Sequence, residues 1–348
     1  MPTRRLAFSV LALMLFASAT CAAEKSLDGM LAPYVARYEL PALAAAAVKR
    51  GVIVASGAAG VRRHGGDVRA TVDDRFHIGS DTKAMTALLC GMYVEAGRLR
   101  WSSTVAEVFP ELADMDAGLR AVTLEQLLSH TGGVAGDNEM LGDLLGKVMS
   151  QPGNLDELRY WLVREWSRQP LQSPPGTRFQ YSNMGYTIAG AMLERVSGKT
   201  WEELVTERVF VPLGLKSAGL GPQSSVGKID APLPHAIVDG RIKPLLAGPN
   251  ADNPLVIGPA GLAHLSARDF ARWAGWNAGE GKRGPPLVTH ATLRKLHTPV
   301  IEMPVKDDAA PGTPSHGGYG LGWGQLRVSW APRPLAYHGG SNGYNLAH

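Results

Sequence analysis

The alternation of apolar and polar positions divides the chain into distinct regions. Residues 42–62 contain two runs of small, apolar residues that turn at Arg50-Gly51, which is typical of a β-hairpin. Residues 80–96 are apolar nearly all round a helix and stop at Gly97. A helix without a polar face predicts a central, buried position.

The rest of the chain is mostly helical in pattern until strand character returns near its end. Helical periodicity covers 123–128, 155–166, 184–196, 201–209 and 267–276, the stretch 218–260 is rich in loops, and strands are expected over 319–328 and 335–337. These elements predict an α/β fold of the α+β type, with a sheet from both ends of the chain beside a helical lobe. A cleft between such lobes is the usual place for a small-molecule site.

The first 23 residues have the pattern of an export signal. Arg4 and Arg5 precede an apolar run over 6–16, and small residues follow up to Ala23. The run is shorter than the roughly 20 residues that span a bilayer, so no stable transmembrane anchor is expected. We expect a signal peptide over 1–23, one domain over 24–348, and a periplasmic or secreted location, with a lipoprotein at Cys21 as the alternative.

Composition excludes several classes of partner. The 348 residues are 45% hydrophobic and 19% charged, and the formal charge falls from +4 to +2 when Arg4 and Arg5 leave with the signal. No run of lysine or arginine is present, so no nucleic-acid partner is expected. Cys90 lies in the apolar helix and is interpreted as core. No metal-binding motif occurs, and no metal, cofactor or partner protein is predicted.

The first motif with chemical potential is Ser80-Asp81-Thr82-Lys83. On a helix, positions i and i+3 share a face, so the serine hydroxyl and the lysine amine can meet. A partly desolvated lysine can activate a serine as a nucleophile, and a helix N-terminus favours a developing oxyanion. A second copy, Ser225 to Lys228, lies in a loop flanked by Gly and Pro and is interpreted as chance.

Two further motifs follow in order along the chain. Tyr181-Ser182-Asn183 comes after a Pro-Pro-Gly turn, and its tyrosine can act as a base only if a cation such as Lys83 lowers its pKa. His338-Gly339-Gly340-Ser341 follows a predicted strand, where glycines allow a substrate to lie against the strand edge. Each tripeptide alone has a structural explanation, and the order of the three makes them informative.

In that order, the motifs resemble the serine β-lactamase and penicillin-binding-protein superfamily, and more closely its class C branch with DD-peptidases, D-aminopeptidases and esterases. Connecting stretches such as LEQLLSHTGG (124–133) and YGLGWG (319–324) resemble it too, and the resemblance covers residues 27–348. It implies a β-lactamase/transpeptidase-like fold with an antiparallel sheet flanked by helices plus a helical lobe. It also implies an enzyme that cleaves a short ester, a D-amino-acid peptide or a β-lactam.

The resemblance assigns roles to the motif residues. Ser80 would be the nucleophile, Lys83 its activator, and Tyr181 the general base and later the acid. Substrate would be bound by Asn183, His338, Gly339, Gly340 and Ser341, with the N–H groups of Ser80 and Ser341 as the oxyanion hole. His338 stands where β-lactamases of this branch carry lysine, and a mostly neutral histidine is a poorer partner for a carboxylate. Weak β-lactam turnover is therefore expected.

Two alternative functions compete with this resemblance, and the end of the chain departs from the family pattern. Gly339 to Gly343 fits the Gly-x-Ser-x-Gly nucleophile elbow, but the required acid and histidine partners do not follow it. A non-catalytic module that binds peptidoglycan or β-lactams with the same fold is the alternative from another class. In relatives further strands and a helix follow the His-Gly strand, whereas seven residues follow Ser341 here. We expect these C-terminal elements to be missing and the domain to be C-terminally incomplete.

Overall fold

The computed structural model describes residues 23–246, 251–303 and 316–348. Apart from Ala23, the predicted signal peptide lies outside these residues, and its prediction stays untested. None of the helices within the described ranges combines the length and hydropathy needed to cross a membrane.

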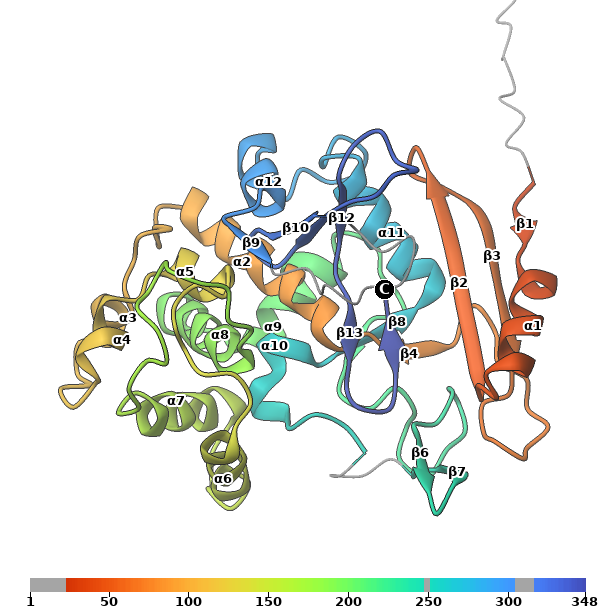
Figure 1. Ribbon diagram of the computed structural model, residues 1–348, viewed down its shortest axis with the longest axis horizontal. Coiled ribbons are helices and arrows are strands. Elements are labelled where there is room, and N and C mark those ends of the chain that lie inside the picture. The colour runs from red at the N-terminus through yellow and green to blue at the C-terminus, as the bar shows by residue number, and fades with distance from the viewer. Residues whose placement is uncertain (1–22, 247–250, 304–315) are drawn as a thin grey trace, which may run out of the picture.

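The predicted N-terminal hairpin is confirmed. Strands β2 (Ala42–Lys49) and β3 (Val52–Gly60) pair antiparallel, and β1 (Lys25–Ser26) adds to β3 in parallel. The turn lies at Arg50 and Gly51, which both have positive φ. Helices α1 (Asp28–Arg37) and α11 (Ala267–Ala278) cover opposite faces of this sheet (Figure 1).

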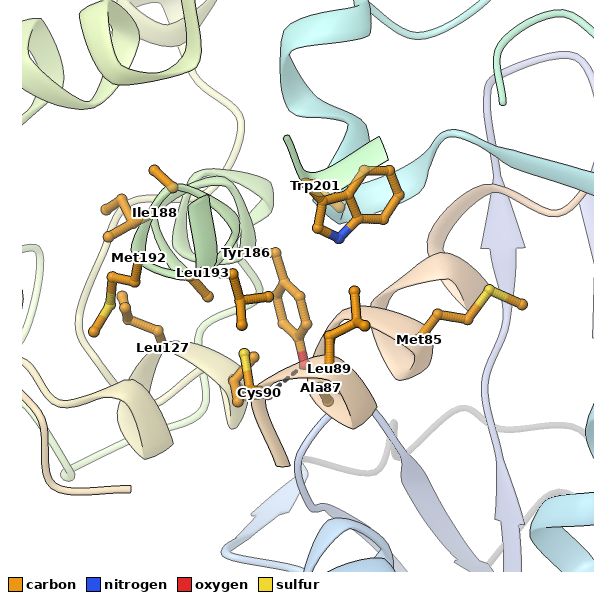
Figure 2. Packing of buried hydrophobic residues seen from close by; sticks show 14 of the residues in the cluster. Met85, Ala87, Leu89, Cys90, Leu127, Tyr186, Ile188, Met192, Leu193 and Trp201 are labelled. Carbon is orange, nitrogen blue, oxygen red and sulfur yellow. Dashed lines mark hydrogen bonds between the residues drawn. The ribbon is translucent and has the colours of Figure 1, made fainter. Parts of the chain in front are cut away.

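The central helix is α2 (Thr82–Glu95), and it is buried as its apolar sequence predicts. All residues from Thr82 to Gly91 are buried. The helix packs against α8 (Asn183–Ser197), α9 (Trp201–Val205), α10 (Gly258–Gly261) and α12 (His290–His297). Figure 2 shows the α2 side chains Leu89 and Cys90 beside Tyr186 of α8, with Met192 of α8 beside Leu127 of the helical lobe. The site residues on these two helices therefore rest on one rigid core.

The helical lobe lies on one side of α2 (Figure 1). It contains α3 (Val105–Val108), α4 (Ala117–Ala121), α5 (Leu124–Leu128), α6 (Glu139–Val148), α7 (Leu155–Trp166) and α8. Capping boxes define where α3, α5, α7 and α9 begin, because a side chain at each start satisfies otherwise free backbone N–H groups. A short π-helix, Thr206–Phe210, follows α9.

The remaining strands form small antiparallel sheets. Sheet β4-β8-β5 consists of Arg75–His77, Ala263–Ser266 and Gly219–Leu220, and β6 (His235–Val238) pairs with β7 (Arg241–Pro244). Sheet β12-β11-β10-β9 consists of Leu335–Tyr337, Gly324–Arg327, His316–Tyr319 and Ile301–Met303. A last hairpin joins β13 (Gly340–Ser341) and β14 (Leu346–Ala347).

The mixed α/β fold with antiparallel sheets and a helical lobe is confirmed, but two details of the strands differ from the prediction. Strands from the two ends of the chain pair in separate sheets within the described residues, not in one. The single strand expected over 319–328 is two strands, because the chain turns at Gly322 with positive φ. A Cβ at Gly322 would lie 2.9 Å from Ala84 Cα, so close packing on α2 requires this turn.

Candidate active site

Ser80 lies in a short 3₁₀ turn, Gly79–Asp81, between strand β4 and helix α2. Thr82 Oγ1 donates to the Gly79 carbonyl at 2.7 Å, which closes this turn at the head of the helix. Gly79 has a φ of +49°, and a Cβ there would overlap the backbone of Ser341. The sequence places glycine before the serine because the chain must approach another strand closely at this point.

Lys83 lies one turn after Ser80 and is fully buried. Its Nζ donates to Ser80 Oγ at 2.9 Å, to Asn183 Oδ1 at 2.7 Å and to the Ala260 carbonyl at 2.7 Å. Burial lowers the pKa of Lys83 from 10.5 to about 7, although the charges of Asp137 and Asp81 act in the opposite direction. The ammonium form donates all three of these hydrogen bonds, and a substantial fraction of the amine is neutral near pH 7. In the neutral form two N–H groups remain for Asn183 and Ala260, and the lone pair accepts from the Ser80 hydroxyl.

Tyr181 approaches Ser80 from the helical lobe. Its hydroxyl donates to Ser80 Oγ at 2.6 Å, and its ring centroid lies 4.6 Å from Lys83 Nζ. Burial raises the pKa of Tyr181, although 38% of the residue's surface is exposed. Loss of hydration around the hydroxyl is the largest cause, the charges of Asp137 and Asp81 act in the same direction, and the hydrogen bond to Ser80 acts against them. Tyr181 is thus a proton donor in the resting site.

Asn183 is the first residue of α8, and both ends of its amide have partners. Its Oδ1 accepts from Lys83, while its Nδ2 donates to Asp137 at 3.1 and 2.9 Å. Sequence reasoning missed Asp137, which lies in an irregular loop after α5 and is exposed. Its only sequence signal is its position four residues after the His-Thr-Gly-Gly stretch, a pattern without chemical meaning by itself.

His130 is a second residue of the site that sequence reasoning passed over. The Ser182 N–H donates to its Nδ1 at 3.1 Å, and its ring centroid lies 4.4 Å from that of Tyr181. Burial lowers the pKa of His130 well below its usual value, so the ring is neutral. It packs between Tyr181 and the aromatic rings of Phe179 and Tyr319, and so fixes the direction of the Tyr181 side chain.

His338 packs beneath the site and does not line its surface. It is 8% exposed, its Nδ1 donates to the Gly339 carbonyl at 2.8 Å, and its Nε2 accepts from the Tyr319 hydroxyl at 2.8 Å. Burial lowers its pKa to about 3. A buried, neutral imidazole gives no positive charge to a substrate, and the substrate-binding role of His338 stays a prediction.

Strand β13 places Gly340 and Ser341 against the Ser80 turn. A Cβ at Gly340 would overlap the Ile78 carbonyl and lie 2.8 Å from Ser80 N, so only glycine fits. The backbones of Ser341 and Ser80 are thereby neighbours, as the predicted oxyanion hole requires. Ser341 itself is exposed, and its Oγ accepts from the Gly343 N–H at 3.0 Å.

The other candidate nucleophiles are not activated. Ser341 leads into the β13–β14 hairpin and not into a helix, which contradicts the nucleophile elbow. Ser225 Oγ donates to Asp230 Oδ2 at 2.6 Å, and Lys228 is exposed, so this second Ser-x-x-Lys forms no pair. Burial raises the pKa of Cys90, which confirms that this thiol is core.

A serine oxygen held between a buried lysine amine and a tyrosine hydroxyl, on this mixed α/β fold, is the arrangement of a serine hydrolase. The Beta-lactamase family model matches residues 27–347, and the chain belongs to this family. The resemblance predicted from the motifs is confirmed at this level, while the class C branch remains a prediction.

Proteins similar in sequence to this chain include a penicillin-binding protein and an esterase. Penicillin-binding protein 4 of Amycolatopsis lactamdurans is 32% identical over 235 residues, which cover 64% of this chain and 56% of that protein. The lovastatin esterase of Penicillium rubens is 30% identical over 165 residues, covering 43% of this chain and 41% of the esterase. The chain thus spans about half the length of these curated relatives.

Solved structures show the same fold. The octameric penicillin-binding protein homologue of Pyrococcus abyssi superposes with a TM-score of 0.73 at 22% identity, covering 91% of this chain and 68% of that one. A D-stereospecific amidohydrolase of Streptomyces gives 0.63 at 25% identity, with coverage of 86% and 82%. The relatives described here include an esterase, an amidohydrolase and penicillin-binding proteins, which agrees with a serine hydrolase.

Proposed function

We propose that this protein hydrolyses an ester or amide through an acyl-enzyme on Ser80. One observation carries the proposal: Ser80 Oγ lies 2.9 Å from the Nζ of the buried Lys83 and 2.6 Å from the hydroxyl of Tyr181. A serine hydroxyl is a weak nucleophile until a neighbouring base removes its proton. Lys83, with a pKa of about 7, is that base.

In the acylation step, Ser80 Oγ attacks the substrate carbonyl and its proton passes to the neutral amine of Lys83. The carbonyl π electrons move to oxygen, and the N–H groups of Ser80 and Ser341 stabilise that oxyanion. When the tetrahedral intermediate collapses, the bond to the leaving group breaks and Tyr181 gives its proton to the departing oxygen or nitrogen. The Lys83 ammonium then returns a proton to Tyr181, so the site regains its starting protonation state.

Deacylation uses the same groups with water as the nucleophile. Neutral Lys83 takes a proton from water directly or through Tyr181, and the hydroxide adds to the acyl carbon. The ester bond to Ser80 breaks, and Oγ recovers its proton from the Lys83 ammonium. Every proton in this cycle moves among Ser80, Lys83, Tyr181, the leaving group and water, and Lys83 and Tyr181 are both in contact with Ser80 Oγ.

The charges around Ser80 favour acyl donors that lack a carboxylate. Lys83 is fully buried, His338 is neutral, and Asp137 places a negative group beside Asn183 at the exposed side. A carboxylate next to the scissile bond, as in a β-lactam, would meet no exposed cation among these residues. We therefore propose short esters and D-amino-acid amides as substrates, with weak β-lactam turnover; the names of the esterase and amidohydrolase relatives support this choice.

The test is to treat the purified protein with a fluorophosphonate and to identify the labelled residue by peptide mass spectrometry. Labelling at Ser80 that is lost in Lys83→Ala supports the activated serine. Turnover of p-nitrophenyl esters in addition supports hydrolysis of the acyl-enzyme. Stoichiometric acylation without turnover would favour the binding module of the same fold. Absence of labelling in a folded sample, or cephalosporin hydrolysis faster than ester hydrolysis, contradicts the proposal.

We also propose that the protein is exported. The support is the sequence of residues 1–23, with Arg4 and Arg5 before an apolar run. Intact-mass measurement of the protein from the periplasm and medium of an expressing bacterium tests this. A mature N-terminus near residue 24 supports export, whereas uncleaved protein confined to the cell interior contradicts it.

A further inference from the structure

A buried histidine–aspartate pair lies directly beside the Ser80 turn, outside the groups used above. His77 ends strand β4, and its side chain is 0% exposed, while that of Asp252 is 4% exposed. The Gly79 N–H donates to His77 Nδ1 at 3.0 Å, so Nδ1 is the acceptor and the ring N–H is that of Nε2. His77 Nε2 is 3.0 Å from Asp252 Oδ1, a close contact without good hydrogen-bond alignment.

The same aspartate oxygen holds the segment that follows Ser341. Asn342 Nδ2 donates to Asp252 Oδ1 at 3.0 Å, and the backbone N–H of Asn253 donates to it at 2.7 Å. Asn342 is itself fixed, because its Oδ1 accepts from the backbone N–H and the side-chain amide of Asn345 at 3.0 and 3.1 Å. We call the connection His77–Asp252–Asn342 the polar link.

Gln223 closes the polar link into a ring. Its Oε1 accepts from the backbone N–H of His77 at 3.0 Å, and its Nε2 donates to Asn345 Oδ1 at 2.9 Å. Each side chain in the ring therefore has partners on two segments that are far apart in sequence. Gln223 is 2% and Asn342 9% exposed, so water does not readily replace these contacts.

The ring is placed where it can control the oxyanion hole. Within the ring, His77 accepts from the N–H of Gly79, the residue before Ser80, and Asn342 is the residue after Ser341. Between these two points the backbones of the Ser80 turn and β13 touch, since a Cβ at Gly340 would lie 2.8 Å from Ser80 N. Strands β4 and β13 are not hydrogen-bonded neighbours in a sheet, so sheet pairing does not set their spacing.

We propose that the polar link positions the backbone N–H groups of Ser80 and Ser341 for oxyanion stabilisation. His77, Asp252 and Asn342 are then positioning residues, which act through backbone groups and touch no substrate. The inference rests on the proposed function of Ser80. Oxyanion donors work only when held in place before the reaction, and a misplacement of about 1 Å can lower a rate by about 100-fold.

Four variants separate this role from general stability. Asp252→Ala removes the oxygen that joins both segments, and Asp252→Asn keeps an oxygen for the same donors while removing the charge. Asp269→Ala is the matched control: Asp269 lies on α11, is 3% exposed and accepts from the Ser217 N–H at 2.7 Å. Asn342→Ala cuts the polar link from its other side and replaces Asp252→Ala if that protein does not fold.

Two readouts are needed. Hydrogen–deuterium exchange with mass spectrometry follows peptides covering 77–81 and 338–345, and it does not depend on activity. Turnover of a p-nitrophenyl ester is divided by the number of Ser80 residues that react with fluorophosphonate, which removes the contribution of unfolded molecules. We expect Asp252→Ala to exchange faster in both peptides and to lose about 10- to 100-fold in turnover per reactive site with little change in KM.

The outcomes distinguish the two proposals. Asp252→Asn should retain turnover within about threefold of the parent, since an acceptor oxygen remains, and Asp269→Ala should leave both peptides and turnover per site unchanged. Unchanged exchange in Asp252→Ala overturns the polar link, and faster exchange with unchanged turnover per site overturns its positioning role while Ser80 hydrolysis stands. If the parent protein itself neither labels nor turns over, the proposed function fails and this inference fails with it.

Discussion

Replacing Asp137 by asparagine should move the pH dependence of Ser80 reactivity to lower pH. Reactivity needs neutral Lys83, so it should rise with pH and reach half its plateau near the Lys83 pKa of about 7. The charge of Asp137 raises that pKa by favouring the ammonium. Asparagine keeps an oxygen for Asn183 Nδ2 and removes the charge, so the pKa of Lys83 should fall.

The size of the shift follows from the geometry. The path from Lys83 Nζ through Asn183 to Asp137 contains hydrogen bonds of 2.7 and 2.9 Å. With the width of one amide between them, the charges lie roughly 7 Å apart, where Coulomb's law gives about 1 kcal/mol at an effective dielectric constant near 50. That energy corresponds to about 0.7 pH unit, which makes the variant about two- to threefold faster at pH 6.5.

The assay is the pseudo-first-order rate of fluorophosphonate labelling between pH 5 and 9, at low and high salt. The two curves should meet at a common plateau above pH 8, and the difference should shrink in high salt because Asp137 is exposed. Asp143→Asn, an equivalent change at an exposed position of α6, is the control and should leave the midpoint in place. A midpoint that stays fixed or moves upward in Asp137→Asn would refute the role of Lys83 as the base.

Further predictions test other contacts of the site. Tyr181→Phe should lower amide hydrolysis by about 100-fold or more but p-nitrophenyl ester hydrolysis far less, because nitrophenolate leaves without a proton; equal losses in steady-state kinetics would contradict the acid role. Gly340→Ala should lower the midpoint of thermal unfolding and abolish labelling, because its Cβ overlaps the Ile78 carbonyl, whereas Gly142→Ala on α6, with open space around it, should be neutral or stabilising. Cys90 should resist iodoacetamide in the native protein and react after denaturation, as followed by intact mass; rapid native alkylation would show that its helix opens.

The sequence predicted the parts of the site that local patterns encode. Ser80 and Lys83 are three positions apart at the start of a helix, so their side chains lie on the same face and can meet. Tyr181 and Asn183 were found through the order of motifs, and the structure brings both to Lys83 or Ser80. The contacts could be anticipated because they depend on side chains at fixed spacing, while the roles of these residues stay predictions.

What the sequence could not predict depends on long-range packing. The Ala260 carbonyl accepts from Lys83, but a backbone oxygen has no sequence signal. Asp137 and Asp252 lie in irregular segments, whose positions are set by the elements they join. The direction of the Tyr181 pKa shift likewise depends on how much water tertiary packing removes around one hydroxyl. Spacing rules contain no information on hydration.

The contacts of Lys83 also tie chemical reactivity to the completion of folding. Its Nζ joins atoms that lie 3, 100 and 177 positions away along the chain. Contacts between such distant positions form late, because long loops must close first. A chain still emerging from the ribosome would stay chemically silent at least until residue 260 has folded back onto α2. A covalent label on Ser80 would therefore report molecules in which α2, Asn183 and Ala260 have come together, and its rate of appearance during refolding would follow the formation of these long-range contacts.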